Sequence, residues 1–254
     1  MILLRSLLFL FSLILLTPPF SLIALLTFPL PALLRFRVIS YWSRMALWLL
    51  RVLCGIRYEV RGREHIPATP TIILSKHQSA WETLAFQQIF PPQVWVMKRS
   101  LLLVPFLGWG LAMLLPIAID RGAGREALKQ VTDQGRDRLK RGLWIVIFPE
   151  GTRVLPGQIG RYGIGGAWLA THTGAQVLPV AHNAGEFWGR NTLRKLPGTI
   201  TLSIGAPIDP AGMKPAELNE KVQTWIEAEM KKIQASGAGR QASGEVGARH
   251  ASPD

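Results

Sequence analysis

The chain has 254 residues, enough for one substantial core, so we expect a single domain with an appendage. It is both apolar and basic, with 48% hydrophobic residues and a formal net charge of +13, which favours a membrane surface as partner. A basic chain also fits nucleic-acid binding, but no zinc-finger spacing, RNA-binding signature or basic region leading into heptads occurs, so we expect no nucleic-acid partner. The single cysteine, Cys54, excludes an intramolecular disulfide and a cysteine-built zinc site.

The N-terminal segment, residues 1–57, is predicted to associate with a membrane. Residues 6–34 carry no charge, and this run is longer than the about 20 residues that a membrane-spanning helix needs. Pro18 and Pro19 are expected to end a helix that begins near Ile2, because proline removes a backbone donor and clashes with the preceding turn. The segment is therefore predicted to be one kinked span or a hairpin of two shorter helices. A cleaved signal peptide is disfavoured, since no clear small-residue cleavage site follows the first apolar block.

Positive charge follows the apolar run. The arginines of this stretch are Arg35, Arg37, Arg44, Arg51 and Arg57. Because the cytoplasmic flanks of membrane segments are enriched in positive charge, we expect this side to lie at the cytoplasmic face.

Residues 58–234 are predicted to form an α/β domain, since short β-rich runs alternate there with helical stretches. Most of the runs are continuously apolar, as expected for strands covered on both faces. We predict a mixed, largely parallel sheet flanked by helices. The predicted strands are residues 71–75, 94–97, 115–119, 143–148, 177–181 and 199–204. The predicted helices are residues 79–89, 124–141, 165–173 and 215–233.

The last predicted helix has one apolar face and is expected to close the fold. Beyond it, residues 235–254 consist mainly of Gly, Ala, Ser and Arg, and Val246 is the only large apolar residue. Such a segment buries too little apolar surface to fold, so we expect a disordered tail.

His77 and Glu82 form the first candidate motif. His77 follows the strand predicted at residues 71–75, at the carboxyl end where open α/β sheets place ligands. On one continuous helix the two side chains would point about 140° apart, but Glu82 can reach back to a histidine that precedes the helix. An imidazole held by a carboxylate can accept a proton from an alcohol through its other nitrogen. Ser79 and Glu82 also match a capping box, so the spacing leaves both roles of Glu82 open.

Residues 148–153, Phe-Pro-Glu-Gly-Thr-Arg, form the second candidate motif. They continue from an apolar run, so a strand would deliver Glu150 and Arg153 to the rim of the sheet. Pro149 ends the strand, Gly151 permits a tight turn, and the Arg153 guanidinium can bind a phosphate in bidentate fashion. The alternative is an ordinary loop closed by a salt bridge between Glu150 and Arg153. Together the two motifs predict an enzyme that acts on a phosphorylated alcohol.

The two motifs, in this order, resemble those of the glycerophospholipid acyltransferase family, whose prototype is 1-acyl-sn-glycerol-3-phosphate acyltransferase. The resemblance covers about residues 58–229. His77 and Glu82 match the histidine and acid of the first block, although the acid is usually aspartate, which is one methylene shorter. Residues 148–153 match the third block residue for residue, and residues 98–108 with 119–121, and 177–180, resemble the second and fourth.

The resemblance implies transfer of a fatty acyl group from coenzyme A or acyl carrier protein to the sn-2 hydroxyl of lysophosphatidic acid, which gives phosphatidic acid in phospholipid synthesis. It implies that His77 is the general base, that Glu82 orients it, and that Arg153 binds the acceptor's phosphate. Arg161 would supply the charge of a lysine that is often found nearby in the family. The further substrate-binding candidates are Glu150, Gly151, Thr152, Arg121, Lys98 and Arg161.

No metal or other cofactor is expected, because a thioester is already activated. The implied partners are membrane lipids, and the implied location is a bacterial inner membrane with the catalytic domain on its cytoplasmic side. Two alternatives stay open. The acceptor could be another lysolipid, such as a lyso-ornithine lipid or another lysophospholipid, or the chain could be a non-catalytic basic protein that binds membranes.

Overall fold

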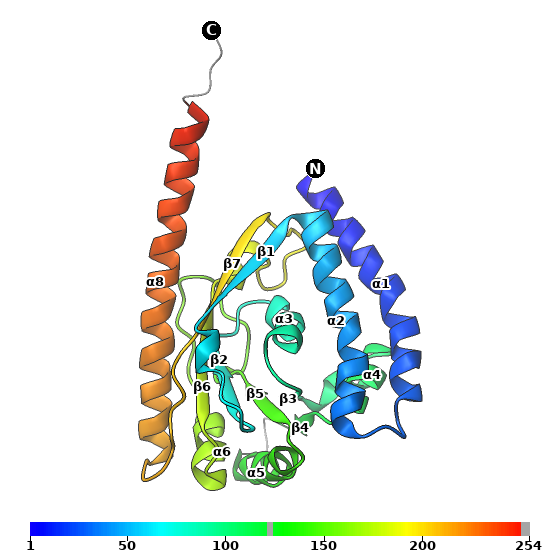
Figure 1. The fold of residues 1–254 in the computed structure, drawn as a ribbon, viewed down its shortest axis with the longest axis vertical. Coiled ribbons are helices and arrows are strands. Elements are labelled where there is room, and N and C mark those ends of the chain that lie inside the picture. Colours follow the sequence, from blue (N-terminus) through cyan, green and yellow to red (C-terminus); the bar gives the residue numbers. More distant parts are fainter. Residues whose placement is uncertain (121–123, 250–254) are drawn as a thin grey trace.

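The computed structural model describes residues 1–120 and 124–249 (Figure 1). The helices are α1 Ile2–Leu26, α2 Ala32–Cys54, α3 Trp81–Ile89, α4 Leu107–Met113, α5 Gly124–Lys140, α6 Gly165–Thr173, α7 Ala184–Phe187 and α8 Pro215–Arg249. The strands are β1 Ile56–Arg61, β2 Ile72–Ser75, β3 Gln93–Lys98, β4 Ile117–Ile119, β5 Trp144–Ile147, β6 Val177–His182 and β7 Gly198–Ile204. Two short 3-10 helices span Arg63–His65 and Arg99–Leu103.

The strands of the described chain form one sheet in the order β1-β7-β6-β2-β5-β3-β4. Neighbouring strands run parallel except for β6 and β7, which run antiparallel. The predicted mixed, largely parallel sheet is therefore confirmed. The central strands β2, β5 and β6 are buried along their whole length, which explains their unbroken apolar sequences.

Helices cover both faces of the sheet (Figure 1). On one face α5, α6 and α8 bury apolar side chains, among them Val131, Leu169 and Ile226, against the strands. On the other face Trp81 and Phe86 of α3 belong to a second buried cluster. This second cluster also contains residues of α1 and α2, so the N-terminal helices share a core with the α/β domain.

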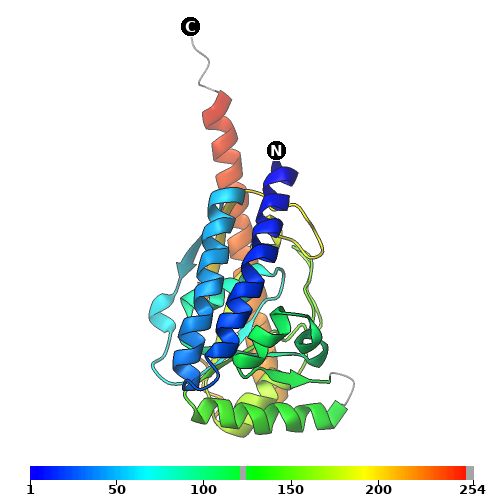
Figure 2. The same ribbon diagram turned by 90° about the vertical axis from the view of Figure 1, so that its right-hand side faces the viewer.

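The N-terminal helices α1 and α2 form an antiparallel hairpin that lies beside α3 and α4 (Figures 1 and 2). The prediction that Pro18 and Pro19 end the first helix is wrong, because α1 continues through both prolines. Each proline removes one backbone hydrogen bond, but packing of α1 along α2 and α4 stabilises the helix across this gap. The chain turns instead between Leu26 and Ala32, so the hairpin has longer helices than predicted.

By length and composition, α1 could cross a membrane, and in the described part of the chain it is the one helix that meets both criteria. Its outer surface is apolar, with exposed side chains that include Leu3, Leu7, Phe11 and Ile14. The N-terminal hairpin and these exposed apolar side chains indicate that the protein associates with a membrane.

Two boundaries differ from the prediction. Strand β1, which was not predicted, begins at Ile56 and so crosses the predicted boundary at Tyr58; its exposed Arg57 and Arg61 mask the strand pattern. Helix α8 continues to Arg249, through a segment that was predicted to be disordered. Residues 235–249 contain no proline, and their alanines, glutamine and arginines favour helix, whereas their four glycines oppose it. Residues 250–254 lie outside the described chain.

Candidate active site

The two candidate motifs meet at the carboxyl edge of the sheet. His77 follows β2, and residues 148–153 follow β5, the parallel neighbour of β2. Strand β6 flanks β2 on its other side and ends at His182. Lys98 ends β3, which lies beside β5. The strand order therefore brings together loops that are far apart in the sequence.

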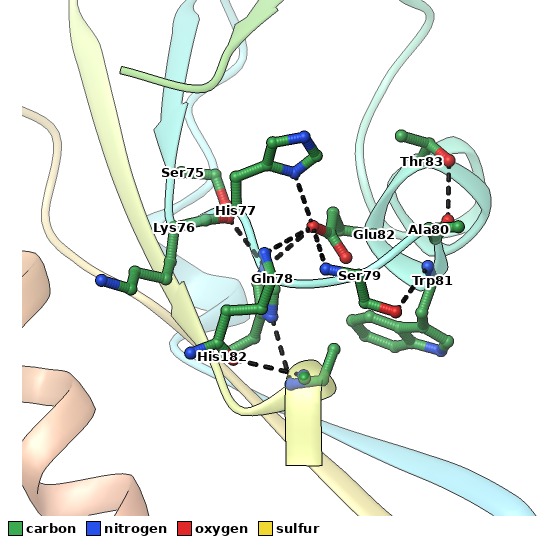
Figure 3. A network of polar contacts seen from close by, with 12 residues as sticks. Ser75, Lys76, His77, Gln78, Ser79, Ala80, Trp81, Glu82, Thr83 and His182 are labelled. Atoms are coloured by element: carbon green, nitrogen blue, oxygen red, sulfur yellow. Dashed lines mark hydrogen bonds and ion pairs between the residues drawn. The ribbon is translucent and has the colours of Figure 1, made fainter. Parts of the chain in front are cut away.

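The imidazole of His77 is held on two sides. Its Nδ1 lies 2.8 Å from Oε1 of Glu82 (Figure 3). Its ring stacks on Phe148 with 4.0 Å between the ring centroids. Helix α3 begins only at Trp81, so His77 lies in the preceding loop and the two side chains do not share one continuous helix. The His77 side chain is 15% exposed, whereas that of Glu82 is fully buried. Only the imidazole of the pair can thus meet a substrate.

Glu82 has both roles that its spacing left open. The same Oε1 that contacts His77 also accepts the backbone amides of Gln78 at 3.0 Å and Ser79 at 2.9 Å. In return the Ser79 hydroxyl accepts the backbone amide of Trp81 at 3.1 Å. Glu82 therefore holds two amides of the loop that leads into α3, as the acid of a capping box does, and it holds the imidazole with the same oxygen atom.

The protonation states follow from this geometry. Burial alone would raise the pKa of the Glu82 carboxyl, but the imidazoles of His182 and His77 and the amide of Ser79 hold the pKa below its ordinary value. Ionised Glu82 can only accept hydrogen bonds, so Nδ1 of His77 carries the proton in their bond. The lone pair of His77 is then on Nε2, which can take a proton from a bound alcohol.

His182, which matches no motif, lies fully buried beneath this loop (Figure 3). Burial lowers the pKa of His182 in spite of the nearby Glu82 carboxylate. The neutral ring donates from Nε2 to the Lys76 carbonyl at 2.9 Å and accepts the Ala184 amide at Nδ1, at 3.3 Å. His182 therefore supports the loop that carries His77, as a structural residue would.

Glu150 lies in the protein interior and not on the wall of a substrate pocket. Its side chain is fully buried, and its Oε2 accepts the backbone amide of His77 at 3.0 Å. Its Oε1 accepts Nζ of Lys76 at 2.8 Å and the amide of Gly160 at 3.1 Å. These bonds take the place of the salt bridge to Arg153 that was the alternative interpretation. The carboxylate faces the protein interior, under the His77 loop.

The remaining residues of the second motif turn back toward His77. Gly151 has φ +67°, a left-handed conformation that glycine adopts without strain, as the predicted turn requires. Thr152 is exposed and Arg153 is half-buried. The amide of Val154 donates to the His77 carbonyl at 2.8 Å, so Arg153 is next in sequence to a residue bonded to the His77 loop. Among the described side chains none binds the Arg153 guanidinium, which leaves it available for an anion.

The other basic candidates that the structure describes lie on different elements. Lys98 is exposed at the end of β3, and Arg161 is exposed in the loop that precedes α6. Arg121 lies outside the described residues. Lys76 was not predicted as a site residue, although a charged residue directly after a buried strand and before a candidate base was a usable signal.

An apolar cavity of about 140 Å³ adjoins the second motif. Phe148, Pro149 and Gly151 line it from β5 and its loop, and Leu128 and Val131 line it from α5.

Three comparisons relate the chain to known proteins. A family model described as Acyltransferase matches residues 57–183. Over 208 residues the chain is 50% identical to the 1-acyl-sn-glycerol-3-phosphate acyltransferase of Pseudomonas aeruginosa, a match that covers 80% of this chain and 81% of that protein. It is 27% identical over 202 residues to the 1-acyl-sn-glycerol-3-phosphate acyltransferase alpha of Bos taurus, over 77% of this chain and 70% of that protein.

The fold is similar to the crystal structure of the 1-acyl-sn-glycerophosphate acyltransferase PlsC from Thermotoga maritima, with a TM-score of 0.77 over 92% of this chain and 96% of that chain. At 22% identity this similarity concerns the fold alone. The family model and the Pseudomonas relative carry the assignment, and they agree with the resemblance of the two motifs. The chain therefore belongs to the acyltransferase family.

Proposed function

We propose that this protein transfers a fatty acyl group from a thioester to the sn-2 hydroxyl of 1-acyl-sn-glycerol-3-phosphate, which gives phosphatidic acid. The observation that carries the proposal is the 2.8 Å contact between His77 and the buried Glu82, beside the loop that carries Arg153. The name of the Pseudomonas relative, half identical over most of this chain, supports the same reaction. An intact base and carboxylate pair also speaks against a non-catalytic membrane protein.

In the proposed reaction Nε2 of His77 takes the proton of the acceptor hydroxyl as its oxygen attacks the thioester carbonyl. The ionised Glu82 stabilises the imidazolium that forms. The tetrahedral intermediate then collapses, the carbon–sulfur bond breaks, and His77 returns the proton to the leaving thiolate. The products are the new ester and a free thiol. The thioester is already activated, so the proposed reaction needs no metal and no cofactor besides its acyl donor.

Arg153 is the proposed ligand of the acceptor's phosphate, because its guanidinium is unpaired among the described side chains and can bind two phosphate oxygens. Thr152 lies on the same turn and offers its exposed hydroxyl, and Gly151 gives the turn its left-handed backbone. Lys98, Arg161 and Arg121 are further candidates, of which Lys98 lies on the adjacent strand end.

The acceptor is an amphiphile, and the apolar face of α1 suits a protein that meets it at the membrane. The lysolipid could keep its chain in the leaflet while its headgroup reaches His77. The arginines along and after α2 favour a catalytic domain on the cytoplasmic side, where coenzyme A and acyl carrier protein both occur. The bacterial relative favours the inner membrane of a bacterium. The acyl chain has a candidate place in the apolar cavity beside Phe148 and Gly151.

A panel of donors and acceptors tests the proposal. The purified full-length protein is mixed with acyl-coenzyme A or acyl carrier protein and with lysophosphatidic acid, lyso-ornithine lipid or lysophosphatidylcholine. We expect thiol release that matches phosphatidic acid formation, fastest with lysophosphatidic acid, and a loss of at least about a hundredfold in His77→Ala. Faster turnover of lyso-ornithine lipid or of lysophosphatidylcholine would replace the proposed substrate, and full turnover in His77→Ala would refute the mechanism.

A further inference from the structure

Lys76 is a buried cation directly next to the proposed base. Its side chain is 1% exposed, and Figure 3 shows it pointing away from the His77 imidazole, from the opposite side of the loop. A lysine is seldom buried unless its charge is paired, because removing the ammonium group from water is costly. The groups around the Lys76 ammonium therefore explain why this side chain is buried.

All three Nζ hydrogens of Lys76 have acceptors. Nζ lies 2.8 Å from Oε1 of Glu150, 2.8 Å from Oε1 of Glu227 and 3.0 Å from the carbonyl of Gln158. Glu227 belongs to α8, far along the chain, and its side chain is 14% exposed. Lys76 thus joins the loop after β2, the loop after β5 and the last helix.

Tyr162 completes the group from the loop before α6. Its hydroxyl donates to Oε1 of Glu227 at 2.7 Å, the same oxygen that Lys76 contacts. Burial, the bond to Glu227 and the nearby carboxylates raise the pKa of Tyr162, so its hydroxyl stays protonated and continues to donate. Glu227 is therefore fixed by two donors from the side of the active site.

The hydrogen bonds of this group extend to the backbone of His77, the proposed base. Glu150 is the shared partner: one oxygen binds Lys76 and the other accepts the His77 amide at 3.0 Å. A displaced Glu150 carboxylate would release this amide and allow the imidazole to shift relative to Glu82 and a bound acceptor. Misplacement of a reacting group by about 1 Å can cost about a hundredfold in rate.

We propose that Lys76, Glu227 and Tyr162 are positioning residues, which hold Glu150 where it fixes the backbone of His77 and so make α8 part of the active site. This inference rests on the proposed acyl transfer, in which His77 is the base. Lys76 carries one positive charge but contacts two carboxylates, those of Glu150 and Glu227. The group is therefore held by the geometry of its hydrogen bonds as well as by charge.

The decisive variants are Glu227→Gln and Tyr162→Phe, with Glu229→Gln as the matched control. Glu229 is also on α8, but its carboxylate accepts the hydroxyl of Ser203 in β7, away from the His77 loop. We expect kcat to fall about tenfold in Glu227→Gln and several-fold in Tyr162→Phe, with KM for lysophosphatidic acid within about twofold of the wild type. The control keeps the wild-type kcat.

Lys76→Met leaves the carboxylates of Glu150 and Glu227 without their shared cation, so the charge of Glu227 then acts unfavourably on that of Glu150. We expect Lys76→Met to be slower than either decisive variant, and Lys76→Met/Glu227→Gln to be faster than Lys76→Met alone. If Lys76→Met does not fold, the comparison of Glu227→Gln with Glu229→Gln still decides the matter.

Hydrogen exchange gives a second readout that needs no substrate. The His77 amide, which Glu150 accepts, should exchange at least about tenfold faster in Glu227→Gln than in the wild type or in Glu229→Gln, because a displaced Glu150 holds this amide less well. Wild-type kcat and exchange in Glu227→Gln, or equal losses in Glu229→Gln, would overturn the positioning network. A wild-type protein that acylates no acceptor, but in which Glu227→Gln still accelerates exchange of the His77 amide, would overturn the proposed function alone.

Discussion

The double role of Glu82 leads to a prediction in which turnover and stability separate. Its Oε1 accepts hydrogen bonds from Nδ1 of His77 and from the amides of Gln78 and Ser79, all within 3.0 Å. In Glu82→Gln an oxygen of similar position remains for the amides, but the negative charge that faces the imidazole is lost. Glu82→Ala removes the acceptor for all three donors, two of which are buried backbone amides.

The magnitudes follow from the strength of charged hydrogen bonds. A bond to a charged group contributes about 1.5–3 kcal/mol, and when the imidazole becomes cationic the neutral glutamine forfeits most of this. A loss of that size in the transition state lowers kcat about 10- to 150-fold. The cap is largely retained in Glu82→Gln, so the free energy of unfolding should fall by about 1 kcal/mol or less. In Glu82→Ala the orphaned donors should cost about 3 kcal/mol or more.

The assay is steady-state thiol release with lysophosphatidic acid, together with chemical or thermal unfolding of each variant in the same detergent. Glu82→Asp provides a further test, because its carboxylate is one methylene shorter and from this backbone position falls short of the imidazole by about 1.5 Å. We expect it to retain more of the cap than of the turnover. A Glu82→Gln protein with wild-type kcat would refute the orienting role, and one that loses several kcal/mol of stability would refute the separation of the two roles.

Three further predictions concern stability and binding. In Arg153→Ala, KM for lysophosphatidic acid should rise about tenfold or more while KM for a phosphate-free acceptor stays unchanged, and equal changes for both acceptors would argue against phosphate binding. In Gly151→Ala, the left-handed backbone at φ +67° should cost about 1–2 kcal/mol in the free energy of unfolding, and an unchanged melting temperature would contradict this. Burial lowers the pKa of His182, so the unfolded chain binds a proton below about pH 6.5 that the folded chain excludes. The free energy of unfolding should therefore fall, by at most about 1.4 kcal/mol per pH unit from this group, as the pH drops from 6.5 toward 5.5. His182→Gln, which can still donate to the Lys76 carbonyl, should show a smaller fall in thermal unfolding at these two pH values, and an identical pH dependence would exclude this origin.

The sequence predicted the fold correctly where a strand is buried on both of its faces. Strands β2, β5 and β6 read as continuous apolar runs because helices cover both faces of the sheet, and their observed ends differ from the predicted ones by at most one residue. Strand β1 was missed because it carries alternating charged residues at the edge of the sheet. Helices α4 and α7 are too short to show a helical period, and α1 passes through Pro18 and Pro19 because tertiary packing outweighs a local rule.

The residues of the candidate site could be identified from local sequence: a histidine after a buried strand, an acid in the next helical turn, and an arginine on a glycine turn. These features depend on neighbours in sequence, so local patterns reveal them. The folded chain was needed to show that one oxygen of Glu82 serves both the cap and the imidazole, and that Glu150 faces inward beneath His77. The fold likewise revealed that Lys76 pairs with Glu227 on α8. Such pairings depend on strand order and helix packing, which join residues far apart in the chain and leave no local pattern in the sequence.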